Sequence, residues 1–177
     1  MWDHSTTTTT FVQKLQANDS RAWDRFREIY IPLIYALAKE YSSNESDARQ
    51  ITERIVEKTT AGLATFERKK RHGLRNFIKT ICFRQISNFH RQQKRDAKKL
   101  DSKLFDKRFS ELELRRAITI AKKRSRATEA SWNLFHLRHE QKLSIKEIAA
   151  KKGVKPDTVQ TTIRRLVIAV QRVLNGK

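Results

Sequence analysis

Apolar residues recur at steps of three and four along almost the whole chain, and this spacing most constrains the fold. One example brings Ala22, Phe26, Ile29, Leu33 and Leu37 to a single face of a helix. Glycine and proline occur only four and two times in 177 residues, and no segment alternates polar and apolar residues for long. Both observations argue against strands. The sequence therefore predicts an all-α protein.

The helical segments group into two parts. Residues 11–95 are expected to form a three- or four-helix domain, and residues 110–177 a second small helical domain. Residues 96–109 are mostly charged, which fits an interdomain linker or a helical extension. Residues 1–10 contain a Ser/Thr run and are expected to be a disordered tail. The expected architecture is thus two helical domains joined by a charged linker.

The formal net charge of +20 predicts a polyanionic partner. Nucleic acid, an anionic membrane surface and an acidic protein are the candidates. No run of about 18 apolar residues exists, and the N-terminus lacks signal-peptide features. We therefore expect a cytoplasmic protein that does not insert into a membrane.

Motifs of catalysis are not found in the sequence. Cys82 is the only cysteine, which excludes an internal disulfide and a multi-cysteine zinc site, and its apolar neighbours indicate a core thiol. There is no P-loop, no glycine-rich dinucleotide loop and no paired metal-ligand spacing. We expect no enzyme activity, no catalytic residue, no cofactor and no metal site.

The clearest local motif begins at Ser144 and predicts a helix-turn-helix. Ser144 and Glu147 have the spacing of a capping box. Gly153 stands where the first helix must end with a positive φ. Val154 is expected to enter the core at the turn, and Pro156 suits the first turn of the next helix.

The helix expected after Pro156 has an apolar face and a polar face. The polar side chains are of the kinds that hydrogen-bond base edges and phosphates, so we expect them to bind DNA. They are Lys155, Asp157, Thr158, Gln160, Thr161, Arg164 and Arg165.

A second basic segment covers residues 67–99. It has twelve Lys and Arg residues and two acidic ones, a net charge of +10. Phe77, Phe83 and Phe89 are interleaved with these charges. Cations that follow phosphates, combined with aromatic rings, suit single-stranded or melted nucleic acid. Phe77 is expected in the core, whereas the position of Phe83 is open.

The order of these parts resembles that of the extracytoplasmic-function sigma factors. The likeness extends over residues 11–174. It depends on the segments 22–26, 30–35, 46–48, 66–67, 73–81 and 131–135 and on the helix-turn-helix. It implies a region 2-like domain at 11–95, a linker at 96–109 and a region 4-like domain at 110–177.

The resemblance implies roles for three sets of residues. The helix-turn-helix residues named above would read the −35 element. The −10 element and the opened strand would be contacted by the melting helix and its basic loop: Lys69, Lys70, Arg71, Arg75, Lys79, Arg84, Gln85, Asn88 and Arg91. Core polymerase would bind a helix containing Asp47, Gln50, Glu53, Arg54 and Glu57.

The implied function is that of a sigma factor, with promoter DNA and core RNA polymerase as partners and an anti-sigma factor or other regulatory protein as a possible further one. Two departures from the family pattern are reduced acidity of the polymerase-binding helix, at Arg49-Gln50 and Glu53-Arg54, and Cys82-Phe83-Arg84 in the melting helix. They leave open a divergent sigma factor that needs an extra partner. The sequence is also compatible with a helix-turn-helix regulator that recruits no polymerase, with an RNA-binding or structural basic protein, and with a helical nuclease.

Overall fold

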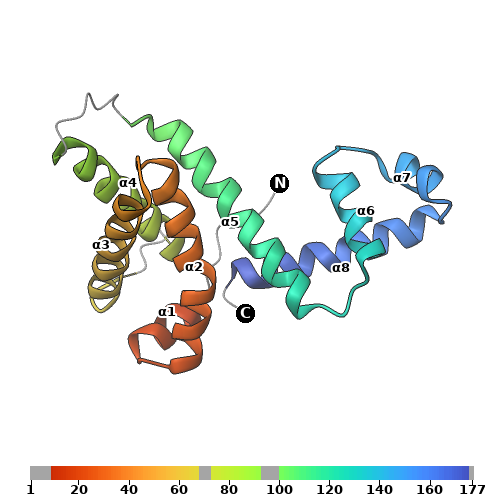
Figure 1. The fold of residues 1–177 in the computed structure, drawn as a ribbon. Helices are drawn as coiled ribbons and strands as arrows, with labels where there is room; N and C mark the ends of the chain where they lie inside the picture. The colour runs from red at the N-terminus through yellow and green to blue at the C-terminus, as the bar shows by residue number, and fades with distance from the viewer. Residues whose placement is uncertain (1–8, 68–72, 93–99, 176–177) are drawn as a thin grey trace. The chain divides into compact units, whose positions relative to one another are not determined.

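The computed structural model describes residues 9–67, 73–92 and 100–175, and in these ranges every regular element is a helix (Figure 1). The all-α prediction is therefore confirmed for the described residues. The elements are α1 (Thr9–Gln16), α2 (Ser20–Glu40), α3 (Glu45–Leu63), α4 (Leu74–Gln92), α5 (Ser102–Arg124), α6 (Glu129–His139), α7 (Ile145–Lys152) and α8 (Pro156–Leu174). No helix among the described residues is long and apolar enough to cross a membrane.

The chain divides into two compact units. Unit 1 comprises Met1–Arg116 with Leu174–Gly176, and unit 2 comprises Ala117–Val173 with Lys177. The division falls inside α5, which begins at Ser102. Within the predicted linker, residues 102–109 are thus helical. Of the tail predicted at 1–10, residues 1–8 lie outside the described residues, and the last two residues begin α1.

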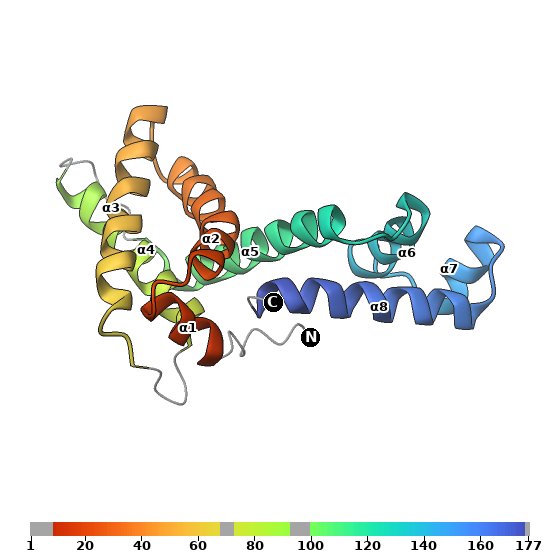
Figure 2. The ribbon, with the colours of Figure 1, turned by 90° about the horizontal axis from the view of Figure 1, so that it is seen from below.

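Unit 1 is built on the packing of α2 against α3 and of α3 against α4, which lie side by side in Figures 1 and 2. Side chains cap two of these helices. Asp19 accepts a hydrogen bond from the Ala22 amide at 2.8 Å, and Asn44 accepts one from the Asp47 amide at 2.8 Å. Although Pro32 lies inside α2, the helix continues through it to Glu40.

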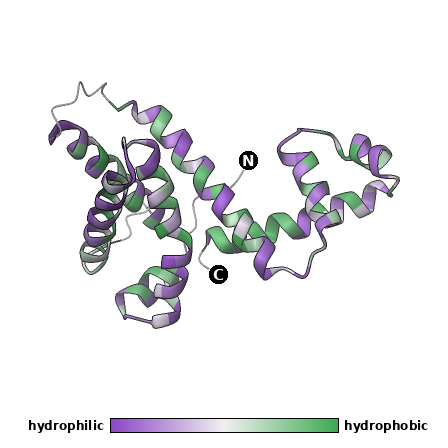
Figure 3. Cartoon of the chain, viewed as in Figure 1, coloured by the Kyte–Doolittle hydropathy of each residue, from purple (hydrophilic) through white to green (hydrophobic). Residues whose placement is uncertain are grey.

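The core of unit 1 consists of the apolar faces that the spacing predicted. Phe26, Ile34, Ile55, Ile78 and Cys82 are among its buried side chains. Figure 3 shows hydrophobic and hydrophilic residues following each other at short intervals along the helices, as amphipathic helices require. Burial raises the pKa of the Cys82 thiol, so this cysteine is a packing residue and stays protonated at neutral pH.

Phe77, which the sequence predicts in the core, lies at its edge. Phe77 is half-buried and packs against Phe66, with 4.8 Å between ring centroids. A Cβ atom added at Gly62 would lie 2.7 Å from the Phe77 ring, so α3 approaches this ring closely because it has no side chain there. The Phe77 ring is thus held between the end of α3 and Phe66, at the rim of the core.

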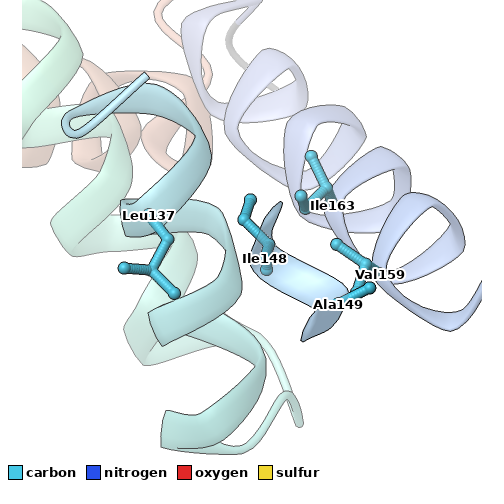
Figure 4. Packing of buried hydrophobic residues seen from close by; sticks show 5 residues of the cluster. All are labelled: Leu137, Ile148, Ala149, Val159 and Ile163. Carbon is cyan, nitrogen blue, oxygen red and sulfur yellow. The ribbon is translucent and has the colours of Figure 1, made fainter. Parts of the chain in front are cut away.

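Unit 2 has its core between α6, α7 and α8. Figure 4 shows Ile148 between Leu137 of α6 and Ile163 of α8, with Ala149 beside Val159. A small residue at 149 lets α8 pass close to α7. Leu134, Leu143, Ile145 and Val167 extend this core with partly buried side chains.

The local geometry confirms the turn chemistry predicted for the helix-turn-helix segment. The Glu147 amide donates to Ser144 Oγ at 3.2 Å, and the Ser144 amide donates to Glu147 Oε2 at 2.7 Å, which completes the capping box. Gly153 has φ 62° and ψ 32°, and α8 begins at Pro156. The expectation for Val154 was wrong, because its side chain is 37% exposed and does not join the core cluster.

Gly153→Ala is expected to lower the free energy of unfolding of unit 2 by about 1 kcal/mol, because a Cβ atom disfavours the left-handed conformation. Urea denaturation followed by circular dichroism measures this loss. Gly73→Ala is the matched control, because Gly73 has no positive φ and a Cβ atom there meets no neighbour. Equal stability of the two variants would contradict the prediction.

Candidate nucleic-acid interface

The exposed face of α8 contains six of the seven residues predicted for the recognition helix, and Lys155 lies directly before its first residue. Val159, Ile163, Leu166, Val170 and Val173 bury the opposite face of the same helix. The amphipathic division is therefore complete, and the polar side chains point away from the core of unit 2. The exposed residues are Lys155, Asp157, Thr158, Gln160, Thr161, Arg164 and Arg165.

Cations on α7 extend the positive charge of this unit. Lys146, Lys151 and Lys152 are exposed, and two of them belong to the last turn of α7, just before the Gly153 turn. None of these lysines was predicted from the sequence, although the position of Lys151 and Lys152 between the buried Ala149 and the turn could have indicated them. An anionic partner that reached α8 would also meet cations on the neighbouring helix.

The residues predicted for the melting helix do not share one surface. Lys69, Lys70 and Arg71 lie outside the described residues. The other six belong to α4 and separate onto two sides of it. One side is open to solvent, and the other is covered by α5.

The open side of α4 contains Arg84, Asn88 and Arg91. Arg84 and Arg91 are exposed, and Asn88 is half-buried. Arg91 Nη2 donates to Asn88 Oδ1 at 2.7 Å, which orients both side chains on the surface. Gln85 lies next to this side and is half-buried. These residues present donors and an amide to an incoming partner.

Arg75 faces α5 and is engaged within unit 1. Its Nε donates to Glu113 Oε2 at 2.6 Å, and its Nη2 donates to Ser110 Oγ at 2.6 Å. The guanidinium also lies 5.3 Å from the centroid of the Phe109 ring. The side chains of Arg75 and Glu113 are 13% and 3% exposed, so this is a buried ion pair. Arg75 therefore belongs to the packing of α4 on α5, which the sequence analysis did not foresee.

Lys79 and Phe83 continue this side of α4. Lys79 Nζ lies 2.9 Å from Asp106 Oδ2, and its side chain is 20% exposed. The Phe83 ring packs edge-on against Phe105, with 5.2 Å between centroids. The position of Phe83, which the sequence left open, is thus in contact with α5.

The residues predicted to bind polymerase lie along α3. Gln50, Glu53, Arg54 and Glu57 are exposed, whereas Asp47 is half-buried in the first turn. Asp47 Oδ2 accepts a hydrogen bond from Asn44 Nδ2 at 3.1 Å, so its carboxylate supports the helix start.

Arg54 connects this face of α3 to α4, because its Nη1 donates to Gln92 Oε1 at 3.3 Å. The exposed surface of α3 is therefore a mixture of carboxylates and cations.

Among the described residues, no three or more His, Cys, Asp or Glu side chains are grouped so that they could hold a metal ion.

No protein-family model matches the chain, and none of the curated proteins is significantly similar to it in sequence. The resemblance to sigma factors therefore depends on the chain's own residues and their order.

Glu113→Ala is expected to lower the free energy of unfolding of unit 1 by about 3 kcal/mol, because it leaves the mostly buried Arg75 without its carboxylate. Glu111→Ala is the control on the same helix. It removes a more exposed partner of Arg108 and should cost less than about 1 kcal/mol. Chemical denaturation of both variants measures the difference, and similar losses would show that the buried pair has no special weight.

Proposed function

We propose that this chain is a transcription initiation factor of the sigma type, which binds promoter DNA and core RNA polymerase. The observation that carries the proposal is α8: its apolar face is buried, its polar face is exposed, and a left-handed glycine turn separates it from α7. In this proposal unit 2 is the region 4-like domain, and the α1–α4 part of unit 1 is the region 2-like domain.

The dimensions and chemistry of α8 suit duplex DNA. A helix of 19 residues is about 28 Å long, and a helix with side chains fits the major groove of B-DNA. Gln160 and Thr161 supply donors and acceptors for base edges. Arg164 and Arg165 can bind guanine or phosphate. The exposed lysines of α7 would add phosphate contacts.

The open side of α4 supports the contact with promoter DNA in unit 1. Arg84 and Arg91 provide charge for the phosphates of an opened strand, and Asn88 provides an amide for a base edge. The exposed face of α3 would bind polymerase through its carboxylates and Arg54. The chain would bind and position DNA, and polymerase would perform the chemistry.

The double variant Arg164→Ala/Arg165→Ala is expected to weaken binding to a promoter duplex. It should also reduce the slope of log K against log salt by about 1.8, if each arginine neutralises one phosphate. Fluorescence anisotropy at several salt concentrations measures both effects. Arg172→Ala is the control because it removes an exposed arginine from the last turn of α8, away from the recognition residues. An equal reduction in all variants would reject α8 as the reading helix.

Run-off transcription with core polymerase and a pool of promoter-like duplexes tests the sigma assignment itself. We expect initiation at a defined start site that depends on the protein and is lost in Arg164→Ala/Arg165→Ala. Truncation of Arg84 or Asn88 should impair opening on duplex templates but not on templates that are already opened. Duplex binding without initiation would reject the assignment.

One observation favours a second function, a helix-turn-helix regulator or a sigma factor that needs an extra partner. Arg75 and Lys79, which the resemblance assigns to the opened strand, are both paired with carboxylates of α5. The transcription assay separates both cases from a sigma factor that acts unaided, because neither would direct core polymerase by itself.

A further inference from the structure

Three residues on one side of α4 each meet a partner on α5. Arg75, Lys79 and Phe83 follow one another at intervals of four, so they form one stripe along the helix. Their partners are a carboxylate and a hydroxyl for Arg75, a carboxylate for Lys79 and an aromatic ring for Phe83. The stripe is thus matched along its whole length by side chains of the first half of α5.

The partners on α5 offer the same chemistry as a single strand of DNA. An unpaired strand presents anionic oxygens to cations and flat rings to aromatic side chains. Glu113 and Asp106 present anionic oxygens, and Phe105 presents a ring. A strand bound to this stripe would contact the side chains of Arg75, Lys79 and Phe83, which already contact α5. The strand and α5 therefore cannot occupy the stripe at the same time.

We propose that α5 is an intramolecular competitor of single-stranded DNA for this stripe of α4. The inference rests on the proposed function and adds a mode of regulation to it. In the resting chain α5 covers the stripe, and an opened strand binds there only when the 102–116 part of α5 leaves.

The remaining contacts of α5 in unit 1 explain why the covered state is the resting one. Phe105 and Phe109 are fully buried and would become exposed on release. Arg108 binds the carboxylate of Glu40 on α2, and Arg116 Nε donates to the Glu28 carbonyl oxygen at 2.9 Å. These contacts lie outside the α4 stripe, so they can be weakened without changing any residue that would touch DNA.

Unlike the buried Arg75–Glu113 pair, the outer ion pairs of α5 are suited to exchange. The Asp106 side chain is 55% exposed, and Glu40 and Arg108 are about one-third exposed. Such pairs exchange readily with water and salt, so they contribute little stability individually. Their substitution is therefore expected to shift the position of α5 without unfolding unit 1.

Two substitutions test the proposal in the full chain. Asp106→Asn removes the carboxylate that holds Lys79, and Glu40→Gln weakens the docking of α5 on α2 without altering the stripe. Asp24→Asn is the matched control, because it makes the same charge change on α2 at a side chain that is 72% exposed and paired with Arg27.

The first measurement is binding to a fluorescent oligothymidine over a range of salt concentrations. Asp106→Asn should bind more tightly than the wild type, with a slope of log K against log salt steeper by about 0.7 for the one released cation. Glu40→Gln should also bind more tightly, and Asp24→Asn should match the wild type. Adding Lys79→Gln to Asp106→Asn should remove the gain. Equal binding by all the single variants would overturn the proposal.

The second measurement is hydrogen–deuterium exchange of the wild type with and without the oligothymidine. The amides of residues 102–116 should exchange faster when the strand is bound, because α5 has left unit 1. Unchanged or slower exchange would overturn the proposal.

Binding of a promoter duplex by the same samples separates the two hypotheses. If duplex binding needs Arg164 and Arg165 but neither Asp106→Asn nor Glu40→Gln changes oligothymidine binding, the competitor is rejected and the proposed function is kept. Tighter oligothymidine binding by these two variants, with no specific duplex binding and no initiation, would keep the competitor and reject the sigma assignment.

Discussion

Burial of one apolar stripe on each helix determines where the positive charge of this protein lies. A helix can direct only part of its circumference toward a core, and the remaining positions take polar residues. With 39 Lys and Arg residues against 19 Asp and Glu residues, the charged residues at those positions are mostly cationic. On α8 the rule has its simplest outcome, because the six predicted polar residues within the helix all remain exposed and the basic surface follows directly from the packing of the helix.

The same constraint has a different outcome on α4, because this helix is covered on two sides. Its apolar stripe packs in the core with α3, and the adjoining stripe of Arg75, Lys79 and Phe83 meets α5. A cation in such a position needs a partner, since burying an uncompensated charge is strongly unfavourable. Glu113, which is 3% exposed, supplies that partner. The buried pair, with Ser110 and Phe109 around it, thus accounts for a charged residue that periodicity alone would assign to the surface.

These two helices illustrate how much could be predicted from the sequence. Local rules were sufficient for the helical class, the capping box, the left-handed Gly153 and the exposed face of α8, because each depends on residues within a few positions of one another. They were not sufficient for Arg75, Lys79 or Phe83. Their partners lie 22 to 38 positions further along the chain, and one helix's periodicity does not reveal which polar side a later helix will cover.

Two further differences have the same origin. Val154 was assigned to the core because an apolar residue at a turn often enters one, yet Leu137, Ile148, Ala149, Val159 and Ile163 already fill the space between the helices. Residues 102–109 have few apolar anchors, which makes them resemble a linker in sequence. In the structure Phe105 and Phe109 are sufficient anchors, because both are fully buried against unit 1.

Exposed and covered cations therefore have different consequences for binding to nucleic acid. A cation on the exposed face of α8 loses only water and counterions when it meets a phosphate, so its contribution follows the salt concentration. A cation such as Lys79 must also leave Asp106, so the intramolecular pair subtracts from the affinity for DNA. The 39 Lys and Arg residues overstate the number of cations available to a partner, because some of them are paired with carboxylates within unit 1. Affinity for an opened strand would thus depend on the position of α5 as well as on the number of basic residues.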